Sequence, residues 1–133
     1  MFRIIAITFV LIASILSVLA APATELEKRK TYNGKATWYV AGLGACGDWD
    51  DGKSNNVVAL SRLRWFSGAN CQQWVSIEAN GQSTYALVRD ECEGCEVDHI
   101  DLSEAAFQAL ADLEVGELNN VKWHFMPRGF EPW

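Results

Sequence analysis

Trp74-Val-Ser-Ile-Glu-Ala-Asn-Gly-Gln-Ser-Thr-Tyr-Ala-Leu-Val88 is the stretch of sequence that decides the fold. Two alternating runs, 74–79 and 82–88, are joined by Asn80-Gly81. A two-residue type I′ turn requires positive φ at both central positions, and Asn-Gly adopts this conformation at low steric cost. The stretch therefore predicts a β-hairpin.

Three further segments have the composition of strands. Gly34-Lys-Ala-Thr-Trp-Tyr-Val40 is aromatic and β-branched and leads into a Gly-rich loop, whose acidic continuation, residues 48–56, is expected to be exposed. Val57-Val-Ala-Leu-Ser61 is a continuous apolar run typical of a strand buried on both faces. Residues 121–125 alternate strictly, as a half-buried strand does. Residues 62–70 favour no single state.

One helix is expected before the last strand. Its apolar positions recur at helical spacing at Leu102, Ala106, Phe107, Leu110 and Leu113. The sequence Asp101-Leu-Ser-Glu104 fits an N-cap with an acidic residue three positions later. Five or six short strands with one helix predict a mainly β domain, a small barrel with a helical insert.

The N-terminus has the pattern of a secreted precursor. Residues 1–20 carry one Arg, a long apolar run and small residues before a cut at Ala20, which predicts a signal peptide. Residues 21–29 are polar and end in Lys28-Arg29, which predicts a propeptide removed by a processing protease. The alternatives are a membrane anchor over 4–21 and a flexible, charged N-terminus. The domain proper is then 30–133.

Charge argues against a nucleic-acid partner. The chain carries 11 basic and 17 acidic residues, a formal net charge of −6, and no segment concentrates Lys and Arg. Its 133 residues leave room for one domain of ordinary size.

All four cysteines lie in the predicted mature domain: Cys46, Cys71, Cys92 and Cys95. An even number in an oxidising compartment indicates two disulfides, with three possible connectivities. Zinc is the competing use, because Cys92-Glu-Gly-Cys95 has the spacing of a metal knuckle and His99 and His124 are available. No second closely spaced ligand pair exists, so we expect neither a metal nor a cofactor.

An ordered set of motifs resembles a known superfamily. The set comprises Gly34-Lys-Ala-Thr-Trp-Tyr39, Gly42-Leu-Gly-Ala-Cys-Gly47, Ala59-Leu-Ser61, Gly68-Ala-Asn-Cys71, Asp90-Glu-Cys-Glu-Gly-Cys95, His99-Ile-Asp-Leu-Ser103, Ala106-Phe107, Leu110 and Gly116. In order and spacing it resembles the double-psi β-barrel of expansins, barwin and rare lipoprotein A, and most of all the single-domain fungal expansin-like or loosenin-like secreted proteins.

The resemblance implies a six-stranded double-psi β-barrel with an open groove for extended polysaccharide. It also implies that Cys46 pairs with Cys71 and Cys92 with Cys95. The groove residues it implies are Asp101, which matches the acid that protonates the glycosidic oxygen in glycosidase relatives, and Thr37 and Tyr39, which match the family's Thr-X-Tyr segment.

Asp101 has two interpretations. A general acid must stay protonated near the working pH, which requires partial burial or neighbouring acids such as Asp90, Glu91, Asp98 and Glu96. As a helix N-cap, Asp101 would instead accept backbone N–H bonds, which depress a carboxyl pKa. His99 is placed to orient Asp101 or to be a buried residue of the barrel wall.

Hydrolysis with inversion needs a second carboxylate across the sugar. Glycosidase relatives carry it just after the Thr-X-Tyr segment, where this chain has Val40-Ala41-Gly42. We therefore expect a protein that is not a hydrolytic enzyme, although a lytic cleavage that needs only one acid stays open.

Among the aromatic candidates for sugar stacking, Trp38, Tyr39, Trp49, Trp65 and Trp74, the best is Trp49 in the acidic loop, while most of the others are expected to anchor the core. The resemblance thus predicts a secreted monomer that loosens cell-wall polysaccharide, cellulose or chitin first, and has no membrane segment after signal cleavage. The alternative is a protein-binding module, such as a cysteine-protease inhibitor or a host-directed effector, that uses the acidic segment Asp48–Asp51 as its recognition surface.

Overall fold

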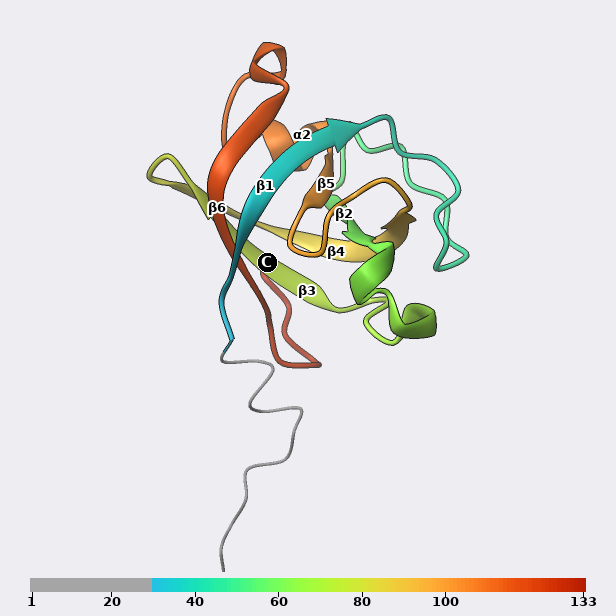
Figure 1. The fold of residues 1–133 in the computed structure, drawn as a ribbon. Coiled ribbons are helices and arrows are strands. Elements are labelled where there is room, and N and C mark those ends of the chain that lie inside the picture. Colours follow the sequence, from blue (N-terminus) through green and yellow to red (C-terminus); the bar gives the residue numbers. More distant parts are fainter. Residues whose placement is uncertain (1–29) are drawn as a thin grey trace, which may run out of the picture.

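The computed structural model describes residues 30–133, which form a closed six-stranded barrel (Figure 1). The strands are β1 (Tyr32–Tyr39), β2 (Val57–Ser61), β3 (Trp74–Ala79), β4 (Gln82–Cys92), β5 (Ile100–Ser103) and β6 (Glu117–Phe125). The predicted signal peptide and propeptide, with Ala20, Lys28 and Arg29, lie outside the described residues. Within the described part of the chain, no helix is both long and apolar enough to cross a membrane.

The barrel mixes parallel and antiparallel pairs in the order β1-β5-β2-β4-β3-β6, closed by β1 against β6. The β1–β5 and β2–β4 pairs are parallel, and the other four are antiparallel. Alternation sends every second side chain inward, so that one core fills the barrel. All five residues of β2 are buried, as its continuous apolar run predicts. The mainly β class with one short helix before the last strand is confirmed.

The predicted hairpin is present. β3 and β4 pair antiparallel from Trp74 opposite Leu87 to Ala79 opposite Gln82. The two turn residues have the positive φ values that a type I′ turn requires, 52° at Asn80 and 75° at Gly81.

The helix differs from its prediction. The α-helix α2 covers only Glu104–Gln108, and its N-cap is Ser103, whose hydroxyl accepts a hydrogen bond from the Ala106 N–H. Asp101 is therefore not the cap, because β5 continues through Ser103 and pairs with β1 and β2. Leu102 belongs to this strand and is fully buried, since it fills the barrel core rather than a helix face.

Short 3₁₀ turns complete the chain: η1 (Arg62–Arg64), η2 (Phe66–Gly68) and η3 (Leu113–Val115). The first two occupy the segment to which the sequence assigned no state. Leu113, expected on the helix, begins η3 instead, and it still packs against the core cluster.

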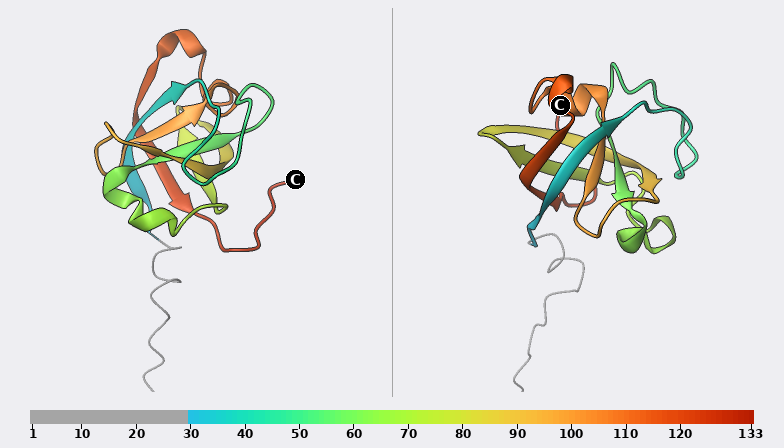
Figure 2. Two further views of the ribbon diagram at one scale, coloured as in Figure 1. Left: turned by 90° about the vertical axis from the view of Figure 1, so that its right-hand side faces the viewer. Right: turned by 45° about the horizontal axis from the view of Figure 1, so that its top comes forward.

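The loop between β1 and β2, residues 40–56, leaves the end of β1 and stands at the side of the barrel (Figures 1 and 2). Within it, Leu43 and Trp49 form an isolated antiparallel bridge. The expectation that 48–56 is exposed throughout is wrong at two positions, because Asp50 and Gly52 are buried.

Candidate functional site

Thr37 and Asp101 lie opposite each other in the parallel pair of β1 and β5. Their neighbours Ala36, Ile100 and Leu102 are buried in the core, so alternation turns Thr37 and Asp101 to the outer surface of the barrel. The backbone register therefore brings together two of the predicted site residues.

Thr37 bridges Asp101 and His99. Its Oγ1 lies 2.9 Å from Asp101 Oδ1, to which it donates, and 2.7 Å from His99 Nε2. A hydroxyl has a single proton. When that proton is directed to the carboxylate, Thr37 must accept from His99, so we assign the imidazole proton to Nε2. His99 is thus joined to Asp101 through Thr37.

Burial acts in opposite directions on the two titratable groups. It is the main reason that the pKa of the Asp101 carboxyl is raised, and the hydrogen bond from Thr37 and the charge of His99 oppose it. Burial is also the main reason that the pKa of His99 is lowered, against the attraction of Asp101. The environment thus favours a neutral imidazole and makes the carboxyl hold its proton more tightly than an exposed Asp.

Tyr39 and Asp90 extend this surface. The pKa of the Tyr39 phenol is raised above its ordinary range, first by burial and then by the charges of Asp90, Asp101 and Asp50. Asp90 on β4 and Asp101 on β5 both pair with Ala59 of β2, so about two strand spacings separate them. We refer to Thr37, Tyr39, Asp90, His99 and Asp101 as the polar face.

The sequence pointed to Asp90 only as a neighbouring charge. The register between β2 and β4 shifts between Val58 and Ala59, which places Arg89 in a bulge. Strict alternation from buried Val88 would send Asp90 inward, whereas the bulge leaves it half-buried with Oδ1 accepting from the Ala45 N–H at 2.9 Å. A bulge of this kind leaves no signal in the pattern of apolar residues.

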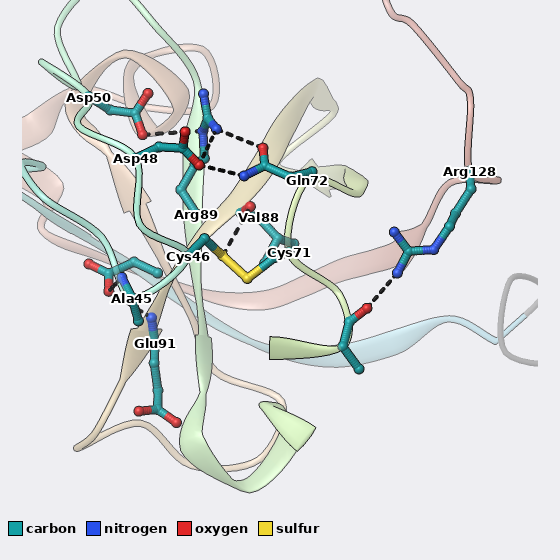
Figure 3. Close-up of a disulfide and its surroundings, with 12 residues drawn as sticks. Ala45, Cys46, Asp48, Asp50, Cys71, Gln72, Val88, Arg89, Glu91 and Arg128 are labelled. Carbon is teal, nitrogen blue, oxygen red and sulfur yellow. Dashed lines mark hydrogen bonds and ion pairs between the residues drawn. A yellow bond between two sulfur atoms is a disulfide. The ribbon is translucent and has the colours of Figure 1, made fainter. Parts of the chain in front are cut away.

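Arg89 holds the loop beside the polar face (Figure 3). Its Nη1 lies 2.7 Å from Asp48 Oδ2 and 2.6 Å from Gln72 Oε1, and its Nε lies 3.3 Å from Asp50 Oδ2. Asp50 is only 4% exposed, and its other oxygen accepts from the Asn55 amide at 2.6 Å. The loop is thus fixed to the β4 bulge by charges.

The disulfide between Cys46 and Cys71 adds a covalent anchor, with a Cα–Cα distance of 5.7 Å. The second disulfide joins Cys92 and Cys95. Both pairings are those that the resemblance implies. Cys92 and Cys95 therefore have no free thiolate for zinc, and residues 30–133 contain no group of three or more His, Cys, Asp or Glu side chains arranged to hold a metal ion.

The aromatic candidates divide by exposure. Trp49 is 70% exposed. Trp38 and Trp65 pack against the core, and the Trp38 indole donates to the Leu113 carbonyl. Trp74 contacts Trp133 edge to face, and both line a pocket of about 320 Å³ beside Arg89. Trp49 is thus the predicted platform residue that the structure leaves open to solvent, while the anchoring role expected for most of the others fits Trp38 and Trp65.

The carboxylates of the acidic segment Asp48–Asp51 are engaged in contacts within the protein, which its composition does not indicate. Asp48 and Asp50 are paired with Arg89, and Asp51 accepts from the Lys53 and Ser54 N–H groups and from the Ser54 hydroxyl. The carboxylates expected to form a recognition surface are largely used to shape their own loop.

The fold and these residues define a class of protein: a disulfide-anchored double-psi β-barrel with a carboxylate and a histidine linked through a threonine on its outer face. A family model for double-psi β-barrels, described as lytic transglycolase, matches residues 31–123, and the chain belongs to this family.

Two relatives differ in how much of their length the chain matches. A papain inhibitor of Streptomyces mobaraensis is 35% identical, over 93% of this chain and 92% of the inhibitor. The allergen Asp f 7 of Aspergillus fumigatus is 36% identical, over 69% of this chain but only 36% of the allergen.

Two solved structures have similar folds. The Streptomyces papain inhibitor superposes with a TM-score of 0.70 at 36% identity, covering 74% of this chain and 96% of the inhibitor. A Clavibacter michiganensis expansin, solved as a point variant in complex with cellohexaose, gives a TM-score of 0.67 at 27% identity and covers 77% of this chain and 54% of the expansin.

Proposed function

We propose that this protein is secreted and binds cell-wall polysaccharide along the polar face without net hydrolysis. The observation that carries the proposal is the hydrogen-bonded unit of His99, Thr37 and Asp101, which combines donors, acceptors and a half-buried carboxyl on an outer surface. Such groups fix the position of sugar hydroxyls. The expansin complex with cellohexaose supports this ligand class, cellulose or chitin first.

The arrangement of carboxyl groups supports the proposed absence of hydrolysis. Inversion requires a second carboxylate free to activate water across the sugar. Asp90 is the carboxylate whose charge acts on Asp101, but its Oδ1 accepts from the Ala45 and Glu91 N–H groups. One oxygen of Asp90 is therefore held by two backbone N–H groups, and Val40-Ala41-Gly42 supplies no other acid.

The test is a pull-down of the disulfide-intact protein on insoluble cellulose, chitin and peptidoglycan. Asp101→Asn should weaken binding to the preferred polymer, whereas Asp112→Asn, at an exposed aspartate without a side-chain capping bond, should not. Equal binding by both variants would contradict the proposal. Analysis of the soluble products separates binding from lytic cleavage, which would release anhydro-sugars and require Asp101 alone as acid.

A second candidate function is inhibition of a papain-like cysteine protease. The similarity to the papain inhibitor supports it, because it extends over nearly the whole of both chains. Titration of papain with the purified protein tests this function directly, and a flat inhibition curve at micromolar protein would eliminate it.

A further inference from the structure

Leu43 and Trp49 form an exposed apolar pair on the loop between β1 and β2. They are 74% and 70% exposed and lie directly opposite each other in an antiparallel bridge. Hydrogen bonds from Gly44 N to Asp48 O and from Asp50 N to Gly42 O flank the bridge, at 2.9 and 3.0 Å. Side chains in such a pair lie on the same face of the ribbon and close together. We call Leu43 and Trp49 the apolar patch.

The exposure of Trp49 results from how its neighbours are held. Asp48 and Asp50, on either side of it, both turn toward Arg89 (Figure 3). In an extended segment the side chain between two such residues points the opposite way. The indole therefore projects into solvent because the two carboxylates are fixed, and burying it would require breaking the ion pair of Asp50.

The patch is also held in a fixed position before any partner binds. The bond from Ala45 N to Asp90 Oδ1 and the bond from Cys46 N to the Arg89 carbonyl tie the ribbon to β4. The disulfide from Cys46 ties it to Cys71, in the segment between η2 and β3. Gly44 packs so closely that a Cβ there would lie 2.2 Å from the Arg89 oxygen. A prearranged surface loses little conformational entropy on binding.

The chemistry of the pair favours a protein partner over a sugar. A pyranose stacks on a flat ring, which Trp49 offers and Leu43 does not. Trp is enriched among the hot spots of protein interfaces, and an aliphatic neighbour adds to the apolar area that the centre of an interface buries. The loop is open to solvent beside Gly42 and Gly47, where nothing lies within 4 Å of a built Cβ. An apolar pair that projects from an anchored loop can enter the substrate cleft of a protease.

We infer that Leu43 and Trp49 are the residues that insert into the active-site cleft of a papain-like cysteine protease. This inference rests on the second candidate function and names its binding surface.

The test compares inhibition constants against papain. Leu43→Asp and Trp49→Ala should each raise the inhibition constant about 30-fold, the loss typical of an interface hot spot. Both side chains are largely exposed, so neither change should affect folding. Leu63→Asp is the matched control, because Leu63 is 52% exposed on η1, and Asp112→Asn is a second control at an exposed aspartate. Both controls should leave the constant within about twofold.

Each outcome has a defined meaning. If the wild-type protein inhibits papain and the two patch variants inhibit equally well, the inference is wrong while the inhibitor function stands. If the wild type does not inhibit, the second candidate function and the inference fail together. If Trp49→Ala weakens only polysaccharide binding and Leu43→Asp changes neither activity, the patch is a sugar platform and the inference is overturned.

Discussion

The polar face and the adjacent loop are held in place by different kinds of interaction. Thr37 and Asp101 are positioned by the backbone register of β1 and β5, which their side chains do not determine. The loop from Gly42 to Asp50 is positioned by one disulfide and by the charges around Arg89. A substitution on the polar face should therefore alter the binding properties of that face with little loss of stability. A substitution among the loop anchors should alter both binding and stability.

The largest effect is expected at Arg89. Arg89→Ala leaves the buried Asp50 carboxylate without its cation, and breaking a buried ion pair in this way costs about 4 kcal/mol. Urea unfolding monitored by tryptophan fluorescence measures the loss. Arg128→Ala is the control, because Arg128 is exposed and donates to the Ala69 carbonyl. Equal losses for the two variants would show that ion pairs do not hold the loop.

Removal of the disulfide between Cys46 and Cys71 should cost about 3 kcal/mol, because it frees a loop with a sequence separation of 25. The double variant Cys92→Ser with Cys95→Ser should cost only about 2 kcal/mol, since its sequence separation is 3. The midpoints of urea unfolding compare the two. The reverse order would mean that the short bridge, rather than the loop anchor, dominates stability.

Gly44→Ala sharpens the comparison within the loop itself. The new Cβ would meet the Arg89 carbonyl oxygen at 2.2 Å, so strand β4 or the loop must shift, at a cost of about 2 kcal/mol. Gly42→Ala, where a Cβ meets nothing within 4 Å, should be nearly neutral. The melting temperatures of the two variants, each compared with the wild type, test this prediction. An unchanged melting temperature for Gly44→Ala would show that the loop is not packed against β4.

The smallest effect is expected on the polar face. The pKa of Asp101 is raised in the folded protein above its ordinary value of 3.8, so its contribution to stability is fully present below that value and is lost as pH rises through the folded pKa. Asp101→Asn should therefore gain stability relative to the wild type between pH 4 and pH 7, by less than about 1 kcal/mol. Parallel urea titrations at the two pH values test this sign, and a relative loss would contradict it.

Local patterns predicted most of the fold. Three predictions that depend only on neighbouring residues are confirmed. They are the hairpin turn at Asn80-Gly81, the buried strand β2 from its continuous apolar run, and the strand β6 from its alternation. The helix start was misplaced because Leu102 satisfies the spacing of a helix and of a strand equally well. β5 has only four residues, too few for periodicity to separate the two.

The site was predictable where it rests on strands and not where it rests on pairing between distant segments. Thr37, His99 and Asp101 lie close together, as the motifs imply. The sequence gives no signal for the role of Arg89. That role depends on a bulge in β4 and on an ion pair with Asp48, which lies about forty residues earlier in the chain. Pairing with Arg89 also accompanies the burial of Asp50, a carboxylate that composition alone would leave exposed.

Closure of the barrel limits how any partner can bind. Each of the six strands has a hydrogen-bonded neighbour on both sides, so the described domain has no free strand to which an extended peptide could add. Recognition must therefore use side chains and loops rather than the backbone ladder. The same property protects concentrated protein against edge-to-edge polymerisation, so the barrel can carry an exposed Leu and Trp without aggregating through its strands.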